Sequence, residues 1–166
     1  MNTKTFNQSP CVNKMDKGER IYICSPLRSN TSQGLEVNMQ AARKYMQYAT
    51  DKFQKRAMAL HAYLPYVFND DIPFERDLAL KLGLDVLTVS DELFVCGNKI
   101  SEGMKGEIEH AALHDKQITV FNKEIYNDVL MIVAGSGSQR FSIKLNTDNP
   151  LLGMPTESVV KDIAMA

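Results

Sequence analysis

Four short apolar runs alternate with longer amphipathic segments between residues 20 and 134, and this alternation constrains the fold more than any other feature of the chain. Short apolar runs are typical of buried strands, whereas apolar residues at every third or fourth position are typical of helices. The predicted strands cover residues 20–24, 59–64, 92–97 and 117–121. Strands and helices in strict alternation favour a parallel sheet covered on both faces. We therefore predict a three-layer α/β domain with four or five parallel strands.

Helix limits follow from the spacing of apolar residues and from residues that start or stop helices. The predicted helices cover residues 35–57, 74–90, 101–114 and 123–133. Pro73 suits the first position of the second helix, although Gly83 lies in its middle. Ser101 is expected to cap the third helix. The short crossovers predict a flavodoxin-like (Rossmann-like) strand order with the first strand central.

The two ends of the chain lack this periodicity. We interpret residues 1–19 as an N-terminal arm, residues 20–134 as the α/β domain, and residues 135–166 as a C-terminal extension. The extension is too rich in Leu, Val, Ile and Met for a solvated linker. We therefore expect it to pack on its own domain or on a partner subunit, with a short helix at 157–164.

Charge and cysteine content exclude several classes of protein. The chain has 19 Lys and Arg against 20 Asp and Glu, with no basic stripe, which argues against binding to nucleic acid or to a lipid surface. Cys11, Cys24 and Cys96 form no CxxC pair, so neither a disulfide framework nor a zinc knot is expected. Without a signal-like or membrane-spanning apolar stretch, we expect a soluble cytoplasmic protein.

Three loops follow the predicted strands at the edge of the sheet where ligands bind in such folds: residues 25–34, 63–75 and 97–107. In the third, Ser101, Gly103 and Met104 open a helix, and its free N–H groups favour a phosphate. The alternative is that Ser101 is only a cap, with Glu107 in the first turns. In the first loop, Arg28 is a potential bidentate partner of a phosphate.

Asp77 and Glu107 are expected to face the same crevice. Two carboxylates around one ligand suit the cleavage of a glycosidic bond, in which one stabilises the sugar and the other handles a proton. The alternative is that Asp77 belongs to a solvated cluster at a helix start. His61, at a predicted strand end, either contacts a base or is packed.

A metal site is a rival interpretation. Glu107, His110 and His114 share one helix face with a spacing that suits three ligands. No second helix offers an acidic or histidine partner, so the alternative is a solvated flank, and no metal site is predicted.

Several motifs resemble those of the nucleoside 2-deoxyribosyltransferase superfamily. They are Tyr22–Arg28, Glu75–Asp77, Asp91–Val95 and Ser101-x-Gly103-x-x-x-Glu107-Ile108. The resemblance covers residues 20–122 and is closer to the 2'-deoxynucleoside 5'-phosphate N-hydrolase branch and its uncharacterised bacterial and phage relatives. The sequence departs from that branch at Ser25-Pro26, where the hydrolases have Gly-Ser, and at Glu109, which replaces a glycine.

The resemblance implies roles for individual residues. Glu107 would be the nucleophile at the anomeric carbon, and Asp77 would assist departure of the base. The remaining candidates would bind substrate: Tyr22, Ser25, Arg28, His61, Ser101, Gly103 and Met104. The transferases carry an aspartate six residues before the glutamate, and Ser101 at this position tolerates a phosphate that a carboxylate would repel. The family also implies a homodimer or a higher homo-oligomer.

The resulting hypothesis is hydrolysis, or less favourably transfer, at the N-glycosidic bond of a nucleoside 5'-monophosphate. The partner is then a small-molecule nucleotide or nucleoside, and no metal or organic cofactor is required. Two alternatives stay open: a nucleotide sensor without turnover, and a glycohydrolase that cleaves NAD. Carboxyl groups of Asp77 and Glu107 opposed across a cleft would favour an enzyme, whereas an Asp77 turned to solvent would favour a binding protein.

Overall fold

A computed structural model describes residues 19–147 and contains one parallel sheet of five strands in the order β2-β1-β3-β4-β5. The strands are β1 Arg20–Cys24, β2 Arg56–Met58, β3 Glu92–Val95, β4 Gln117–Val120 and β5 Ser142–Leu145. The helices are α2 Ser32–Phe53, α3 Pro73–Thr88, α4 Glu102–Leu113 and α5 Lys123–Gly135, with two short 3-10 turns, η1 Leu60–Ala62 and η2 Leu64–Tyr66. The predicted three-layer α/β class with a flavodoxin-like strand order is confirmed, and β1 is an inner strand between β2 and β3.

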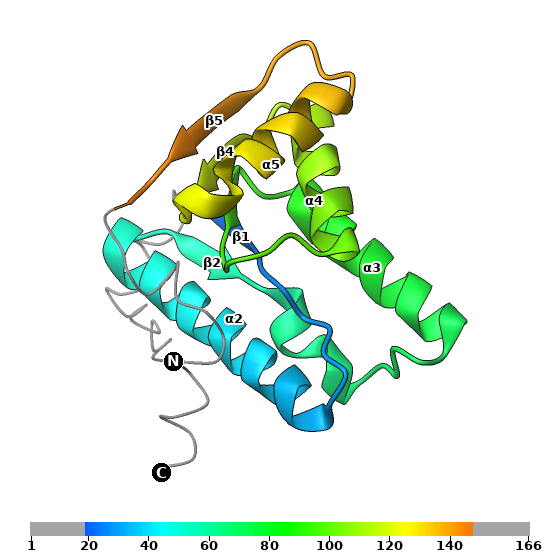
Figure 1. The fold of residues 1–166 in the computed structure, drawn as a ribbon. Helices are drawn as coiled ribbons and strands as arrows, with labels where there is room; N and C mark the ends of the chain where they lie inside the picture. The colour runs from blue at the N-terminus through cyan, green and yellow to red at the C-terminus, as the bar shows by residue number, and fades with distance from the viewer. Residues whose placement is uncertain (1–18, 148–166) are drawn as a thin grey trace, which may run out of the picture.

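Alternating residues of the central strands build two cores. Ile21 and Ile23 of β1 pack with α2 on one face, while Tyr22 and Cys24 pack with α4 and α5 on the other. Figure 1 shows α2 on one side of the sheet and α3, α4 and α5 on the other. Both faces are therefore covered, as parallel sheets require.

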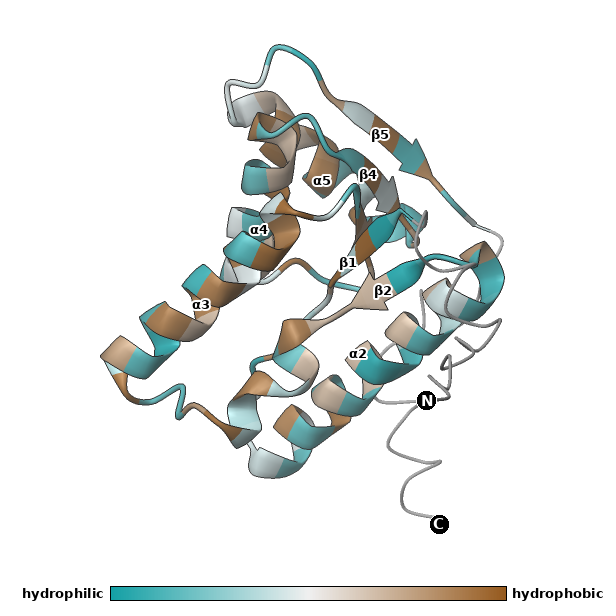
Figure 2. Cartoon of the chain, turned by 180° about the vertical axis from the view of Figure 1, so that it is seen from behind, coloured by the Kyte–Doolittle hydropathy of each residue, from teal (hydrophilic) through white to brown (hydrophobic). Residues whose placement is uncertain are grey.

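Helix α2 begins and ends earlier than its apolar spacing predicts. The Thr31 hydroxyl accepts a hydrogen bond from Gly34 N at 3.0 Å, which starts the helix at Ser32. Gln54 has φ 55° and its N–H bonds to Thr50 O, which ends the helix before residue 57. The banding of α2 in Figure 2 reflects its amphipathic pattern.

The second strand was predicted at the wrong place. Residues 56–58 pair with β1, and residues 59–64 instead turn through η1 and η2. The reason is that β2 lies at the sheet edge and is mostly exposed, so it carries no apolar signal, while the apolar residues after it turn away from the sheet.

Strand β5 has no counterpart in the sequence-based prediction. It pairs in parallel with β4. Ile143 packs against the core that contains residues of α4 and α5, while the other residues of β5 are exposed. The arm at 1–18 and the predicted helix at 157–164 lie outside the described residues. Within 19–147 no helix is long and apolar enough to cross a membrane.

Candidate functional site

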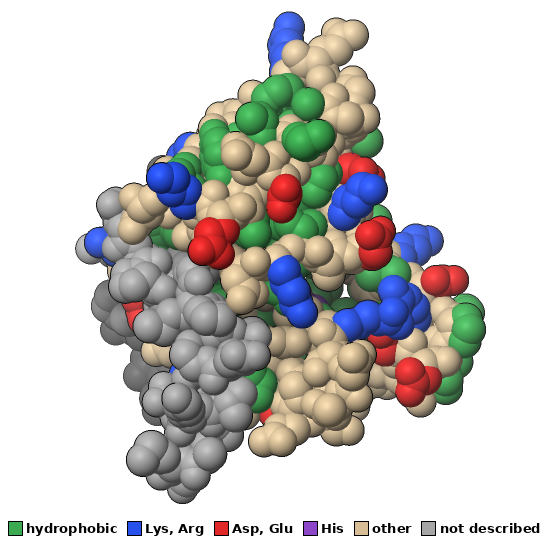
Figure 3. All heavy atoms as spheres, in the orientation of Figure 1, with side chains coloured by type: hydrophobic (Ala, Val, Ile, Leu, Met, Phe, Trp, Pro, Cys, Tyr) green, Lys and Arg blue, Asp and Glu red, His purple; other side chains and the backbone are tan. Residues whose placement is uncertain are grey.

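A cavity of about 860 Å³ lies beyond the carboxyl end of β1. Its walls come from the loop after β1, the start of α2, residues 60–71 and one side of α3, with Glu107 of α4 in its lining. Figure 3 shows a hollow in this face with Lys and Arg side chains at its rim. The cavity occupies the edge of the sheet at which ligands bind in folds of this kind.

Glu107 and Tyr22 form the polar centre of the cavity. The Tyr22 hydroxyl donates a hydrogen bond to Glu107 Oε1 at 2.7 Å, and both residues line the cavity. Burial raises the pKa of Glu107 to about 7, and hydrogen bonds from the Tyr22 hydroxyl and the Cys24 thiol oppose this rise. Burial, followed by the charge of Glu107, raises the pKa of Tyr22 well above its usual value. At neutral pH this carboxyl group exists in both protonation states.

Gly83 makes room for this pair inside α3. A Cβ at this position would lie 3.0 Å from the Tyr22 hydroxyl and 3.8 Å from Glu107 Oε1. The glycine that weakened the helix prediction is therefore the residue that lets α3 approach the two polar groups.

His61 and Ser25 form a second polar pair. The Ser25 hydroxyl lies 2.8 Å from His61 Nε2, and burial lowers the pKa of His61 to about 4. His61 is therefore neutral at physiological pH. It lines the cavity, whereas Ser25 is buried behind it at the end of β1.

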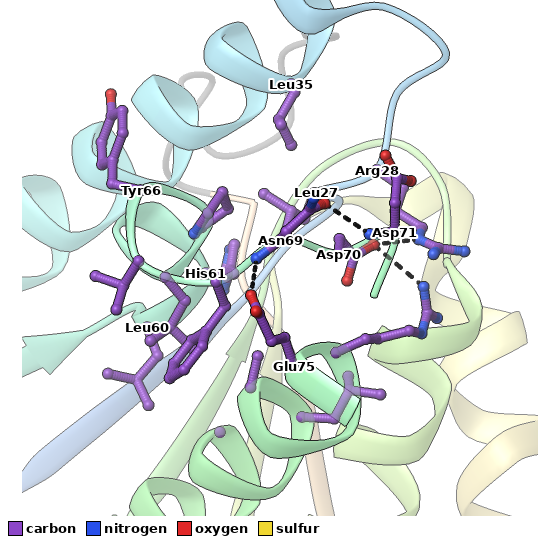
Figure 4. A pocket seen from close by; sticks show the side chains of 18 of the residues that line it. Leu27, Arg28, Leu35, Leu60, His61, Tyr66, Asn69, Asp70, Asp71 and Glu75 are labelled. Atoms are coloured by element: carbon purple, nitrogen blue, oxygen red, sulfur yellow. Dashed lines mark hydrogen bonds and ion pairs between the residues drawn. The ribbon is translucent and has the colours of Figure 1, made fainter. Parts of the chain in front are cut away.

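Two arginines meet one carboxylate at the rim. Asp70 Oδ2 accepts from Arg28 Nε at 2.7 Å and from Arg76 Nη1 at 3.1 Å, and all three residues line the cavity. Asn69 N, one residue earlier, donates to Glu75 Oε2 at 2.6 Å. Figure 4 shows Arg28, Asp70, Asn69 and Glu75 on one side of the pocket with these contacts dashed.

The structure brings together some of the predicted site residues and separates others. Tyr22, Arg28, His61 and Glu107 line the cavity. Ser101, Gly103 and Met104 are not among its lining residues. Instead, the Ser101 hydroxyl accepts from Met104 N at 3.3 Å and caps α4, and the Met104 side chain is in the core.

Asp77 does not face the crevice of Glu107, contrary to the expectation from sequence. It is exposed on α3, while Arg76, Ala79, Leu80 and Gly83 supply the helix face that lines the cavity. The reason is helical geometry, because residue 77 lies on a different face from residues 76, 79, 80 and 83.

The residues of the rival metal site have other partners. His110 Nε2 lies 2.8 Å from Thr88 Oγ1, and the His110 ring stacks on His114 with centroids 4.0 Å apart. Within residues 19–147, no group of three or more His, Cys, Asp or Glu side chains is arranged to hold a metal ion.

Sequence reasoning missed Asp70 and Gly83 as site residues and included Arg76 only as a member of the Glu75–Asp77 motif. No motif marks Asp70, since its role depends on a turn that brings residue 70 between Arg28 and Arg76. Gly83 carried a usable signal, because a glycine inside a helix often marks a close approach of another group.

Comparison with known proteins gives a family without an assigned function. The family model "Domain of unknown function (DUF7768)" matches residues 19–121, and the chain belongs to this family. None of the curated proteins matches the chain. Among solved structures, the chain is similar to a Clostridium botulinum CMP N-glycosidase, BcmB, at 12% identity and a TM-score of 0.44, over 89% of this chain and 98% of that chain.

Proposed function

We propose that this member of the DUF7768 family hydrolyses the N-glycosidic bond of a nucleoside 5'-monophosphate, with Glu107 acting on the anomeric carbon. The observation that carries the proposal is the Glu107 carboxyl group in the cavity wall, oriented by the Tyr22 hydroxyl at 2.7 Å. A volume of about 860 Å³ accommodates a nucleotide. The motif resemblance supports the same role for Glu107.

The environment of Glu107 suits this chemistry. Positive charge develops at the anomeric carbon as the bond to the base breaks, and a carboxylate beside it stabilises that charge. A phenol and a thiol compensate the negative charge of Glu107 only weakly. The ionised carboxylate is therefore stabilised more by a nearby positive charge than a carboxylate in water would be. Tyr22 fixes the position of one oxygen, so little reorganisation is needed during the reaction.

The other predicted residues have distinct proposed roles. Arg28 binds the 5'-phosphate, while neutral His61 borders the sugar or base as a hydrogen-bonding group held by Ser25. Hydrolysis is proposed in preference to transfer. The homodimer or higher homo-oligomer expected from the resemblance stays a prediction.

The position of Asp77 favours a second candidate function. An exposed Asp77 outside the cavity lends no support to its role in assisting the base, and a nucleotide-binding protein without turnover needs no such group. Both candidates use the same cavity, and they differ in whether base is released.

Release of free base decides between these functions. The protein is incubated at pH 7.5 with nucleosides, ribo- and deoxyribonucleoside 5'-monophosphates and NAD, and products are separated by chromatography. We expect base from a monophosphate, with Glu107→Gln lowering kcat about a thousandfold. Glu109→Gln, which removes a carboxylate from the same helix, is the matched control and retains activity.

Other outcomes point elsewhere. Tight nucleotide binding with no base from any substrate would support the sensor, and nicotinamide release from NAD alone would support the NAD glycohydrolase. Base release that survives in Glu107→Gln would contradict the assigned role of Glu107.

A further inference from the structure

Two cationic side chains from separate elements converge on one point of the cavity wall. Arg28 comes from the loop after β1 and Arg76 from the first turns of α3, yet both donate to the same oxygen, Asp70 Oδ2. Two guanidinium groups fixed around one point are the arrangement that binds a phosphate with several hydrogen bonds.

Asp70 is held weakly at this point. Its side chain is 43% exposed and that of Arg28 is 61% exposed, so water screens both ion pairs. Exposed ion pairs of this kind contribute little to stability, and a dianion can compete with the single charge of Asp70.

The loop around Asp70 is fixed independently of its carboxylate. Asn69 N donates to Glu75 Oε2, Asp71 N donates to Asn69 Oδ1 at 3.0 Å, and Ile72 N donates to Asn69 O at 3.1 Å. Rotation of the Asp70 side chain into water therefore frees both arginines without a change in the backbone.

We propose that Arg28 and Arg76 form the subsite for the phosphate of a sugar phosphate or nucleotide, and that Asp70 is a built-in competitor for this subsite. The inference extends the proposed function, because it assigns the substrate's phosphate to the start of α3 instead of the start of α4. Arg76 becomes a specificity-determining residue. An anion must displace the Asp70 carboxylate from both arginines in order to bind. This competition favours a dianionic phosphate over a monoanionic carboxylate.

Ribose 5-phosphate is the probe, because it has no glycosidic bond to a base and its binding is independent of turnover. Calorimetry on the full chain at constant ionic strength should show binding about tenfold weaker in Arg76→Gln. Binding should be about two- to fivefold tighter in Asp70→Asn, since that change removes the competitor. The tightening should disappear in the double variant Asp70→Asn/Arg76→Gln, and ribose without phosphate should not respond to Asp70→Asn.

Asp71→Asn is the matched control, since it removes one negative charge from the same loop beside the cluster. Equal tightening in Asp71→Asn, or unchanged or weaker binding in Asp70→Asn, overturns the competitor role. Loss of affinity in Ser101→Ala with none in Arg76→Gln assigns the phosphate to α4 and overturns the subsite. Asp70→Ser gives a second test of the same charge, and thermal unfolding verifies that each variant is folded.

The proposed function and this inference fail separately. Absence of base release from every substrate, combined with the expected affinities for ribose 5-phosphate, contradicts the enzyme and supports the subsite. Base release that depends on Glu107 while Arg76→Gln leaves affinity and KM unchanged contradicts the subsite alone.

Discussion

Two carboxylates of this chain, at opposite ends of the sheet, are removed from bulk water in different ways. Glu92 begins β3 and is 5% exposed, while Glu107 lies at the cavity beyond the carboxyl end of β1. Glu92 accepts a hydrogen bond from the Thr119 hydroxyl at 2.6 Å and pairs with Lys55 at 3.3 Å and Lys144 at 3.2 Å. Within residues 19–147, Glu107 is paired with no lysine or arginine and has the phenol of Tyr22 and the thiol of Cys24.

This difference separates a carboxylate whose charge is compensated by cations from one whose charge is not. Two ammonium groups and a hydroxyl compensate the charge of Glu92, so this carboxylate connects β3, β4, β5 and the segment before β2. The donors around Glu107 are neutral and only partly oppose the effect of burial, which raises the pKa of Glu107 to about 7. A carboxyl group left partly uncompensated in a cavity is costly for stability and available for chemistry.

Replacement of each glutamate by glutamine should have opposite effects on stability, with stabilisation expected at Glu107. Between pH 4.5 and about 7 the folded state holds a proton on Glu107 that the unfolded state has lost, so stability falls as pH rises. The full rise corresponds to up to about 3 kcal/mol. We expect Glu107→Gln to be more stable than wild type at pH 8 by about 1–3 kcal/mol, with the difference vanishing below pH 4.5, as measured by urea unfolding.

His61 provides the internal control for this experiment. Burial lowers its pKa from 6.5 to about 4, so the unfolded state binds the extra proton and stability is lost as pH falls through this range. The slopes of His61 and Glu107 therefore oppose each other between pH 4.5 and 6.5. In Glu107→Gln only the contribution of His61 remains, so the free energy of unfolding should fall more steeply as pH decreases. A dependence on pH parallel to that of wild type would refute the uncompensated state of Glu107.

Glu92→Gln should destabilise the fold by about 2 kcal/mol at pH 7. The amide cannot neutralise Lys55 and Lys144, although its oxygen can still accept from Thr119. Breaking a fully buried pair costs more, but both lysines can turn towards water here. Urea unfolding gives the free energy, and Glu109→Gln controls for loss of one carboxylate. An unchanged or increased stability would show that Glu92 is not the structural partner described above.

The same comparison explains what the sequence could and could not predict. Buried strands and the Ser101 cap have local signals, so β1, β3, β4 and the start of α4 were predictable. Edge strands β2 and β5 have few buried residues and no apolar run. At the site, Glu107, Tyr22, Arg28 and His61 follow from strand ends and motifs. Asp70 and the face of Asp77 depend on the path of residues 60–72, which no periodicity specifies.

The smallest effect on stability is expected at Lys144, the most exposed member of the cluster that Glu92 forms with Lys55, Thr119 and Lys144. Lys144 of β5 is 54% exposed, whereas Lys55 is 25% exposed and also pairs with Glu19. Screening therefore limits the Lys144–Glu92 pair to about 0.5 kcal/mol. The Lys144–Glu92 pair and the backbone hydrogen bonds to β4 join β5 to the sheet. Loss of this pair should therefore destabilise β5 more than the rest of the sheet.

Lys144→Met removes the charge and keeps most of the length of the side chain. It should lower global stability by about 0.5 kcal/mol, while amide exchange in β5 accelerates more than exchange in β3. Lys81→Met, on the exposed side of α3, is the control and should change neither. If exchange in β5 and β3 accelerates equally, Lys144 contributes to the whole sheet and the cluster is a single cooperative unit. A selective effect on β5 would instead show that Glu92 is compensated chiefly by Lys55 and Thr119, which are the partners least exposed to water.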